Sequence, residues 1–480
     1  MKLSRLISCL EEKEVSGSLE VQVKGIASDS RKVRPGYLFI SIKGFESNGH
    51  RFIEKAVRGG ASCLIVEEEV KSSLPVVRVP NSRRAAGLLA ARFYGYPAKR
   101  LRLIGITGTN GKTTTTYLIE SILKEAGLKV GRLSTTEYRI GEKIFKAAHT
   151  TPDAVLLQRL FAYALAKGVT HLVMEVSSHA LSLERIAGCD FAYGVFTNLS
   201  HDHLDFHKNM EDYFSSKLRL FDGSVLVEKA IINIDDPYGR RIAEKTKAKV
   251  IPYQLSIINY QLSIVNCQLS IEGVPVHLKL PGRHNLYNAL AASMVALGEG
   301  IEPQAIKDGL ETIEFVPGRF QLVSCGQPFK VVVDYAHTPE ALKNVLSLCR
   351  ELKPKRIITL FGCGGDRDRK KRPIMGKLAS QMSDLVIITS DNPRSEEPGD
   401  IIKEIEEGIK DKRSCLVIVD RKKAIAKALS LAKEDDLVLI AGKGHEDYQI
   451  LKDRTIPFDD RKIAKEILGQ ITDDGQYSDF

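Results

Sequence analysis

The most specific chemistry in this chain lies in one glycine-rich stretch. Its residues are Thr107, Gly108, Thr109, Asn110, Gly111, Lys112 and Thr113. Apolar residues 101–106 predict a strand before it, and a helical pattern follows as far as Ala126. A strand, a glycine loop and a helix in this order bind phosphate, because backbone N–H groups and the partial positive charge of the helix N-terminus face the anion.

Two residues of this loop have predicted roles. Lys112 can reach the terminal phosphates of a nucleotide, and Thr113 can offer its hydroxyl to Mg²⁺. The spacing is a variant, because Ile106 stands where the usual first glycine would be. A glycine turn that binds nothing is the alternative interpretation.

Metal-binding residue types follow two further predicted strands. Glu175 lies near the C-terminal end of the strand predicted at 171–176, at the edge where open α/β sheets bind ligands, and can hold Mg²⁺ opposite Thr113. A capping or salt-bridged acid is the alternative. Residues 197–207, TNLSHDHLDFH, fit zinc, Mg²⁺ with one histidine, or a solvated polar loop. By residue type alone, Lys217 on its predicted helix is a solvent-facing charge.

Three polar loops in the last third of the chain also follow predicted strands. They read GCGGDRDR at 362–369, DNPR at 391–394 and GKGHE at 442–446. If they lie at one sheet edge, Arg367 and Arg394 can bind carboxylates and Glu446 can bind an ammonium group. Together these loops could enclose a zwitterion.

The elements that must position these residues form a predicted α/β protein. A chain of 480 residues is too long for one ordinary domain. Pattern changes predict three domains: 1–97, a small α/β domain; 98–318, a central phosphate-loop domain with a parallel sheet; and 319–480, a Rossmann-like doubly wound domain. Buried strands alternating with helices in the second and third regions support this division.

Composition excludes several classes of protein. The chain has 43% hydrophobic and 27% charged residues, which is ordinary for a globular protein. It has no apolar run approaching the ~20 residues of a membrane span, and the apolar stretch near Met1 is too short for a signal peptide. Eight scattered cysteines without a CxxC pair fit a reducing cytoplasm. The net charge of +10 fits either a solvated basic surface or a preference for polyanionic small molecules such as nucleotides. Nucleic acid is unsupported, because the basic residues are dispersed and no recognition motif is present.

A short repeat interrupts the central region. The tetrapeptide QLSI begins at Gln254, Gln261 and Gln268. Leucine and isoleucine two positions apart fit a strand better than a coiled coil, so we interpret the segment as an insertion in a hairpin or surface loop without a functional role.

Taken together, the motifs resemble the Mur ligase family. TGTNGKTT, EVSSHAL, TNLSHDHLDFH, VDYAHTP, GGDRDRKKRP, DNPR and GKGHEDYQ occur in the family's order across nearly the whole chain. DNPR is the family's diaminopimelate signature. Two features depart from the family: Leu183 replaces a polar substrate contact of some relatives, and the QLSI segment has no counterpart.

The resemblance implies a role for each site residue. The UDP-MurNAc-dipeptide site would comprise Ser28, Ser30, Phe45, Glu46, Ser47, Thr150, Thr151, Ser177 and Arg185. ATP would be bound by residues 107–113 with Asn285 and Asn288. Diaminopimelate would be bound by Arg367, Asp391, Asn392, Pro393, Arg394, Gly442 and Glu446. Thr113, Glu175, His203 and Lys217 would hold Mg²⁺, with Lys112, Lys217, Glu175 and His203 as the catalytic set. Lys217 would carry a carbamate derived from CO₂.

The implied activity is ATP-dependent amide formation in peptidoglycan precursor synthesis. The enzyme would add meso-diaminopimelate to the D-glutamyl γ-carboxylate of UDP-MurNAc-L-Ala-D-Glu through an acyl phosphate, and we expect a cytoplasmic monomer. Three alternatives stay open: the same ligase using L-lysine, a folylpolyglutamate synthase-like ligase, and a nucleotide-binding regulator without ligase activity.

Overall fold

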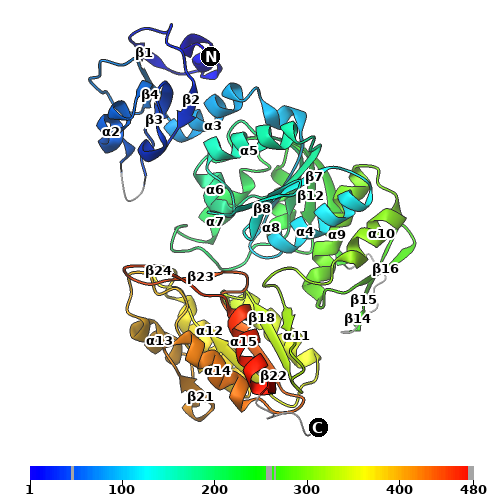
Figure 1. Cartoon of the computed structure of the whole chain (residues 1–480). Coiled ribbons are helices and arrows are strands. Elements are labelled where there is room, and N and C mark those ends of the chain that lie inside the picture. The colour runs from blue at the N-terminus through cyan, green and yellow to red at the C-terminus, as the bar shows by residue number, and fades with distance from the viewer. Residues whose placement is uncertain (45–47, 256–261, 264–265, 474–480) are drawn as a thin grey trace.

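The chain forms three lobes that follow one another in sequence (Figure 1). The computed structural model describes residues 1–44, 48–255, 262–263 and 266–473. Phe45, Glu46 and Ser47, predicted for the UDP site, lie outside the described residues. No helix in the described part of the chain is long and apolar enough to cross a membrane.

The N-terminal lobe is built on a five-stranded sheet of order β1-β5-β4-β3-β2. Its strands are β1 Glu14–Ser16, β2 Gly25–Ala27, β3 Tyr37–Ile40, β4 Ala61–Val66 and β5 Val76–Arg78. Its helices are α1 Leu3–Leu6, α2 Ile53–Arg58 and α3 Ser82–Phe93. Only β1 runs antiparallel to its neighbour. The two faces of the sheet carry separate clusters of buried apolar side chains.

The central lobe has an eight-stranded sheet of order β13-β12-β11-β6-β10-β7-β8-β9. Its strands are β6 Arg102–Thr107, β7 Val130–Leu133, β8 Glu137–Ile140, β9 Lys143–Lys146, β10 His171–Glu175, β11 Asp190–Phe196, β12 Leu226–Asn233 and β13 Lys249–Tyr253. Its helices are α4 Lys112–Glu125, α5 Ala154–Ala166, α6 Ser178–Ser182, α7 Met210–Leu218, α8 Pro237–Lys245, α9 Arg283–Gly298 and α10 Pro303–Thr312. All pairings are parallel except those of β8 and β9.

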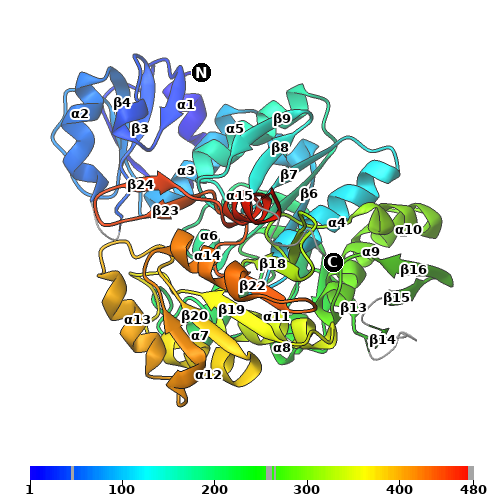
Figure 2. The ribbon, with the colours of Figure 1, turned by 60° about the horizontal axis from the view of Figure 1, so that its bottom comes forward.

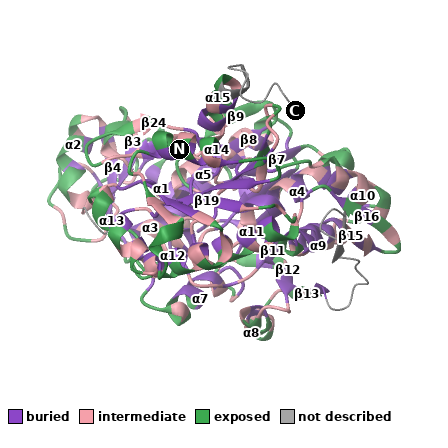
Figure 3. Ribbon diagram, turned by 90° about the horizontal axis from the view of Figure 1, so that it is seen from below, coloured by how far each residue is buried: buried purple, intermediate pink, exposed green. Residues whose placement is uncertain are grey.

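Alternating side chains of the central strands enter two different cores. Ile104 and Ile106 of β6 pack with α4, α9 and α10 on one face, while Leu103 packs with α5 on the other. This strand, buried at every position after Arg102, is therefore covered on both sides, as expected for a parallel sheet. Figure 3 shows these buried strands enclosed by more exposed helices.

The QLSI segment contributes to a small antiparallel sheet beside α10. Its strands are β14 Leu262–Ser263, β15 Asn266–Ile271 and β16 Val274–Leu278. The third repeat lies in β15, where Leu269 and Ile271 are buried in the same core as α9 and α10. The expected strand and hairpin are confirmed there, and the repeat also supplies core residues. Parts of the first two repeats lie outside the described residues.

The C-terminal lobe is a doubly wound domain with a six-stranded sheet of order β17-β18-β22-β19-β20-β21. Its strands are β17 Gln321–Val323, β18 Lys330–Asp334, β19 Ile357–Phe361, β20 Leu385–Ile388, β21 Cys415–Val417 and β22 Leu437–Ala441, with a separate hairpin of β23 Tyr448–Ile450 and β24 Thr455–Pro457. Its helices are α11 Pro339–Glu351, α12 Lys371–Met382, α13 Pro398–Glu406, α14 Arg421–Leu431 and α15 Asp460–Asp473. Only β17 is antiparallel within the large sheet. The hairpin faces the central lobe (Figures 1 and 2).

Candidate active site

The phosphate loop connects β6 to α4, as the sequence predicts. Gly108 and Gly111 adopt φ values of +148° and +86°, which side-chain-bearing residues rarely do. A Cβ on Gly108 would lie 1.9 Å from Oγ1 of Thr197, so only glycine fits. Nζ of Lys112 donates to the carbonyls of Gly108 and Thr109 at 2.9 and 2.8 Å, folded back over its own loop. Burial lowers the pKa of Lys112.

Two asparagines of α9 pack against this loop. Asn288 and Asn285 are 4% and 5% exposed, and Nδ2 of Asn288 donates to Oδ1 of Asn285 at 3.0 Å. Oδ1 of Asn288 accepts a hydrogen bond from Thr115 at 3.3 Å and lies beside Gly111. The structure thus brings both asparagines, distant in sequence, to the phosphate loop.

Glu175 lies at the end of β10 and faces the start of α4. Its Oε1 accepts hydrogen bonds from the Thr113 hydroxyl at 2.9 Å and from the Thr135 backbone N–H at 2.8 Å. Its side chain is buried, and the predicted opposition of Glu175 and Thr113 is present. Nη2 of Arg319 donates to Oγ1 of Thr113 at 3.1 Å, so a residue of the third predicted domain reaches the phosphate loop.

Lys217 is fully enclosed by the central domain. Its side chain is 1% exposed, and its Nζ donates to the carbonyl of Gly108 at 2.7 Å and lies 4.5 Å from the centre of the Tyr213 ring. Within the described residues it forms no ion pair with a carboxylate. Burial first, and then the charge of Lys112, lowers its pKa far below the ordinary value. The interpretation of Lys217 as a solvent-facing charge is therefore wrong.

His203 lies in the loop after β11 with a left-handed backbone, at φ +55°. Its Nε2 is 3.4 Å from Oδ2 of Asp202, and its ring packs edge-on against that of His179. Burial lowers the pKa of His203 to about 3 even though Asp202 opposes this effect. The imidazole is thus neutral at pH 7 and has a lone pair available. Across the described residues, no group of three or more His, Cys, Asp or Glu side chains is placed to hold a metal ion.

The three C-terminal loops meet at one edge of the sheet, as predicted. Nδ2 of Asn392 donates to Oε2 of Glu446 at 2.8 Å, and Nζ of Lys443 donates to the same Oε2 and to Oδ1 of Asn392, both at 3.1 Å. Burial and the nearby charge of Asp391 raise the pKa of Glu446, although Lys443 opposes them. Lys443 is completely buried, so a fixed positive charge lies beneath this cluster of acids.

The arginines of these loops lie above the cluster. Arg394 has φ +53°, and its Nη1 donates to the carbonyl of Gly365 at 2.7 Å. Arg367, Arg394, Asn392 and Gly442 line the same cavity as Glu446. Pro393 lies between Asn392 and Arg394, and its carbonyl faces Gly365 so closely that a Cβ there would lie 1.9 Å away.

Four residues predicted for the dipeptide are also together. Oγ1 of Thr151 donates to the carbonyl of Glu175 at 2.9 Å and accepts from the N–H of Ser177 at 3.1 Å. Nη1 of Arg185 donates to the carbonyl of Thr151 at 2.9 Å, and Thr150 accepts from Thr135 at 3.2 Å. Ser28 and Ser30 lie directly after β2 in the N-terminal lobe, separate from this group.

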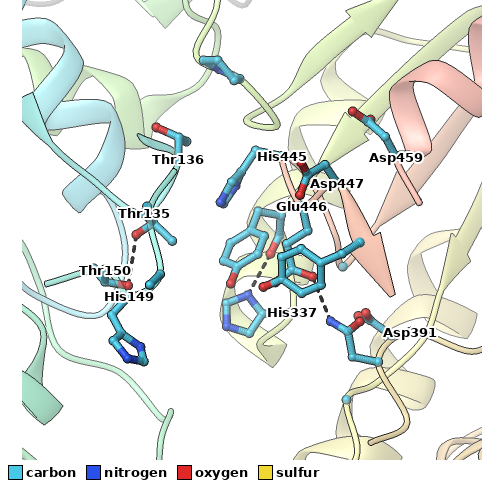
Figure 4. Close-up of a pocket in the computed structure, with 18 of the residues that line it drawn as sticks. Thr135, Thr136, His149, Thr150, His337, Asp391, His445, Glu446, Asp447 and Asp459 are labelled. Carbon is cyan, nitrogen blue, oxygen red and sulfur yellow. Dashed lines mark hydrogen bonds between the residues drawn. The ribbon is translucent and has the colours of Figure 1, made fainter. Parts of the chain in front are cut away.

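Two large cavities lie between the central and C-terminal lobes. One, of about 630 Å³, is lined by the phosphate loop, Glu175, Lys217 and α9. The other, of about 670 Å³, is lined by the C-terminal loops and by Thr135 and Thr150. Figure 4 shows this second cavity, with threonines of the central domain facing Asp391 and Glu446 across His337 and His445. The two cavities share five residues: Thr135, Thr150, His203, Tyr335 and His337.

This arrangement can bring three reactants together. A nucleotide in the first cavity would direct its terminal phosphate, near Lys112, toward the shared residues. An amino acid in the second cavity would meet cations and a carboxylate suited to a zwitterion. The geometry therefore defines a site in which a phosphoryl group and an amine reach one acceptor.

Sequence reasoning assigned no role to three residues that the structure places in the site. Lys443 lies within the GKGHE motif but was not distinguished from a solvated lysine. Arg319 follows a Pro-Gly turn, and Thr135 follows β7. The one available signal was their position just after a predicted strand or at a domain boundary, which does not reveal burial or a partner.

The fold and site define a class of ATP-dependent acid–amine ligase in which a phosphate-loop domain faces a second α/β domain. Three family models match in chain order: the Mur ligase family catalytic domain over residues 22–94, the Mur ligase middle domain over 106–296 and the Mur ligase glutamate ligase domain over 318–444. The chain belongs to the Mur ligase family.

Full-length relatives within the family carry the name of one particular ligase. The chain is 43% identical to UDP-N-acetylmuramoyl-L-alanyl-D-glutamate–2,6-diaminopimelate ligase of Clostridium tetani, over 98% of this chain and 100% of that protein. It is 47% identical to the ligase of the same name from Aquifex aeolicus, over 93% and 94%. A solved structure of a ligase of that name has a TM-score of 0.68 at 32% identity, covering 99% of this chain and 100% of that one. Folylpolyglutamate synthase of Mycobacterium tuberculosis, at 18% identity and a TM-score of 0.64 over 75% of this chain and 92% of its own, shares the fold alone.

Proposed function

We propose that this protein is an ATP-dependent ligase of peptidoglycan precursor synthesis that joins meso-diaminopimelate to UDP-MurNAc-L-Ala-D-Glu. The observation that carries the proposal is the meeting of two cavities, one lined by the phosphate loop and one by paired cations and acids, at five shared residues. The names of its full-length relatives supply the identity of the substrates.

The first step activates the D-glutamyl γ-carboxylate. One carboxylate oxygen attacks the γ-phosphorus of ATP, the bond to the β–γ bridging oxygen breaks, and acyl phosphate and ADP result. Lys112 and the loop N–H groups neutralise the charge that builds on the phosphate oxygens. To do so, Lys112 must give up its hydrogen bonds to the carbonyls of Gly108 and Thr109. The free-energy cost is small, because neutral carbonyls are weaker acceptors than charged phosphate oxygens.

The second step forms the amide. The amine of diaminopimelate attacks the acyl carbon, the nitrogen passes its proton to water, and the tetrahedral intermediate expels inorganic phosphate. Arg394 and Arg367 would bind the distal carboxylate of the amino acid, and Glu446 would bind the ammonium group at that same end, which leaves the amine at the other end to react. The buried charge of Lys443 keeps Asn392 and Glu446 oriented. A distal carboxylate gives Arg394 a partner that L-lysine lacks, which favours diaminopimelate.

Three residues that line the nucleotide cavity fit Mg²⁺. Thr113 and Glu175 provide a hydroxyl and a carboxylate 2.9 Å apart, and His203 provides a neutral imidazole. When bound, the ion would neutralise phosphate charge. Within that site Thr113 and Glu175 hold each other in place, and Arg319 fixes the Thr113 hydroxyl from the other domain.

Lys217 also fits the carbamate. Its buried amine has a strongly lowered pKa, and the neutral form can attack CO₂ to give an N-carboxylate with loss of a proton. The resulting anion would face Lys112, which contributes to the lowered pKa of the free amine. Carbamylation would therefore place an anion beside Lys112, where a second protonated lysine would be repelled.

The test is the dependence of ADP release on all substrates. The full-length protein with ATP, Mg²⁺, bicarbonate and UDP-MurNAc-L-Ala-D-Glu should release ADP with meso-diaminopimelate and much less with L-lysine. Lys112→Ala should abolish this release, while Lys124→Ala, whose side chain is 49% exposed in the last turn of the same helix, should retain it. No ADP release by the wild-type protein with all substrates would refute the proposal, and equal use of lysine would refute the choice of amino acid. The reaction implies action in the cytoplasm, and we expect a monomer.

A further inference from the structure

The loops of the amino-acid site leave the C-terminal sheet at strands that are not neighbours. Loop 391–394 follows β20 and loop 442–446 follows β22, with β19 between them. Ladder hydrogen bonds join only adjacent strands, so the sheet provides no direct bond between the two loop origins. The spacing of the two loops therefore depends on contacts made at the sheet edge.

Arg421, the first residue of α14, makes such a contact. Its Nη2 donates to the carbonyl of Ala441 at 2.9 Å, and its Nη1 donates to the carbonyl of Ser390 at 3.4 Å. Ser390 directly precedes Asp391, and Ala441 directly precedes Gly442. One planar guanidinium therefore binds the origins of both loops, which the flexible ammonium of a lysine cannot reproduce.

Asp460, the first residue of α15, holds this guanidinium. Its Oδ1 accepts from Nε of Arg421 at 2.8 Å and its Oδ2 from Nη2 at 2.7 Å, and both side chains are completely buried. A buried ion pair of this kind contributes little net stability compared with apolar residues of similar volume, because both charges are desolvated. Stability alone therefore explains it poorly. Asp459, next to Asp460, lines the amino-acid cavity, so the pair also ties α15 to the site.

Two glycines leave space above β19 for loops 391–394 and 442–446 to approach each other. At Gly362, directly after β19, a Cβ would lie 2.2 Å from the carbonyl of Thr389. At Gly442 a Cβ would lie 2.9 Å from Oδ2 of Asp391. Because both positions lack a side chain, the two loops approach each other over β19, and Asn392 reaches Glu446 across the gap. A small change in their spacing would break that contact.

We propose that Arg421, held by Asp460, is a positioning residue that fixes the spacing of loops 391–394 and 442–446 and thereby the affinity for the incoming amino acid. This inference rests on the proposed function, which supplies the amino acid as a substrate. Arg421 touches no substrate itself and acts through the two backbones that it binds.

The test is Arg421→Lys in the full-length protein. Lysine keeps a positive charge beside Asp460 but cannot bind both carbonyls and the carboxylate in one plane. The KM for meso-diaminopimelate should rise by about 10-fold or more, while the KM values for ATP and for UDP-MurNAc-L-Ala-D-Glu stay within about twofold. Thermal unfolding of each variant shows whether the fold is retained.

Arg356→Lys is the control at the opposite edge of the same sheet, where the arginine is 40% exposed and its carboxylate partner is buried. Arg356 precedes β19 and binds Asp436, which precedes β22 and is 1% exposed, with Nε of Arg356 3.1 Å from Oδ2. This ion pair also joins two strands but lies away from the loops. The KM of Arg356→Lys for diaminopimelate should match that of the wild type.

Two results would overturn the inference: an unchanged KM for diaminopimelate in Arg421→Lys, whether or not kcat falls, or the same rise in Arg356→Lys. If Arg421→Lys does not fold, Asp460→Asn, which removes the charge but keeps the shape, is measured with the same expected and opposing outcomes. A wild-type protein without ligation refutes the proposed function. A ligating wild type with an unaltered Arg421→Lys variant refutes only the positioning role.

Discussion

Gly111 allows the geometry of the phosphate loop to be tested with one methyl group. Its φ is +86°, and a Cβ would lie 2.4 Å from Oδ1 of Asn288. That asparagine accepts from Thr115 and donates to Asn285. Gly111→Ala therefore adds left-handed backbone strain of about 1–2 kcal/mol. It also displaces an asparagine whose two hydrogen bonds contribute about 1 kcal/mol each.

Gly127 provides a control at the other end of the same helix. Its φ is +78°, and a Cβ there would meet nothing within 4 Å. Gly127→Ala should therefore introduce the strain without the collision. The difference between the free-energy costs of the two substitutions isolates the contact with Asn288. It amounts to about 2 kcal/mol, which corresponds to about 30-fold in a dissociation constant.

The collision can be relieved in two ways, and both can be measured. If the loop moves, affinity for a non-hydrolysable ATP analogue with Mg²⁺, followed by calorimetry, should be about 30-fold weaker in Gly111→Ala than in Gly127→Ala. If the loop keeps its shape, Gly111→Ala should unfold at a lower temperature without nucleotide. Equal nucleotide affinity together with equal unfolding temperature in the two variants would show that the reasoning is wrong.

Further predictions concern the two charged regions of the site and acid stability. Lys217→Ala should lose ligation and partly regain it with acetate or another short carboxylic acid, because the acid replaces the carbamate; absence of any rescue would count against that group. Arg394→Ala should raise the KM for diaminopimelate by about 10-fold or more while leaving that for ATP unchanged, and an equal loss with L-lysine would contradict recognition of the distal carboxylate. Hydrogen bonds from Arg372 lower the pKa of Glu396 from 4.5 to about 2. Because the folded-state pKa is depressed, this stabilisation is present above pH 4.5 and is lost as the pH falls toward 2. Glu396→Gln should therefore reduce the fall in unfolding temperature across that range, and an unchanged pH profile would argue against the pair.

Local sequence patterns were sufficient for the elements that frame the site. The apolar run before Gly108 became β6, and the helical pattern after Gly111 became α4, which ends before Gly127. These features depend on neighbouring residues, because strand and helix periodicity and left-handed glycines act within a few positions. The position of the QLSI repeat could be predicted only in part. Its periodicity indicated a strand but did not reveal that Leu269 and Ile271 are buried in the core formed with α9 and α10.

A general rule of topology extended the prediction to the meeting of distant loops. Since parallel strands end at the same edge, the loops of Arg367, Asn392 and Glu446 were expected to converge, and they line one cavity. The family resemblance, and not the residue pattern, provided the substrates and the expected roles of Ser28, Thr150 and their partners.

By itself the sequence determined the alternation of the main strands and helices, the phosphate loop and the edge of each parallel sheet at which polar residues gather. Only the tertiary structure decided which of the charged side chains lose contact with water. Lys217 lies against the carbonyl of Gly108, 109 positions away, and Lys443 lies beneath Asn392, 51 positions away. The burial of a lysine depends on the segments packed around it, and those segments come from distant parts of the chain, where no local pattern records them.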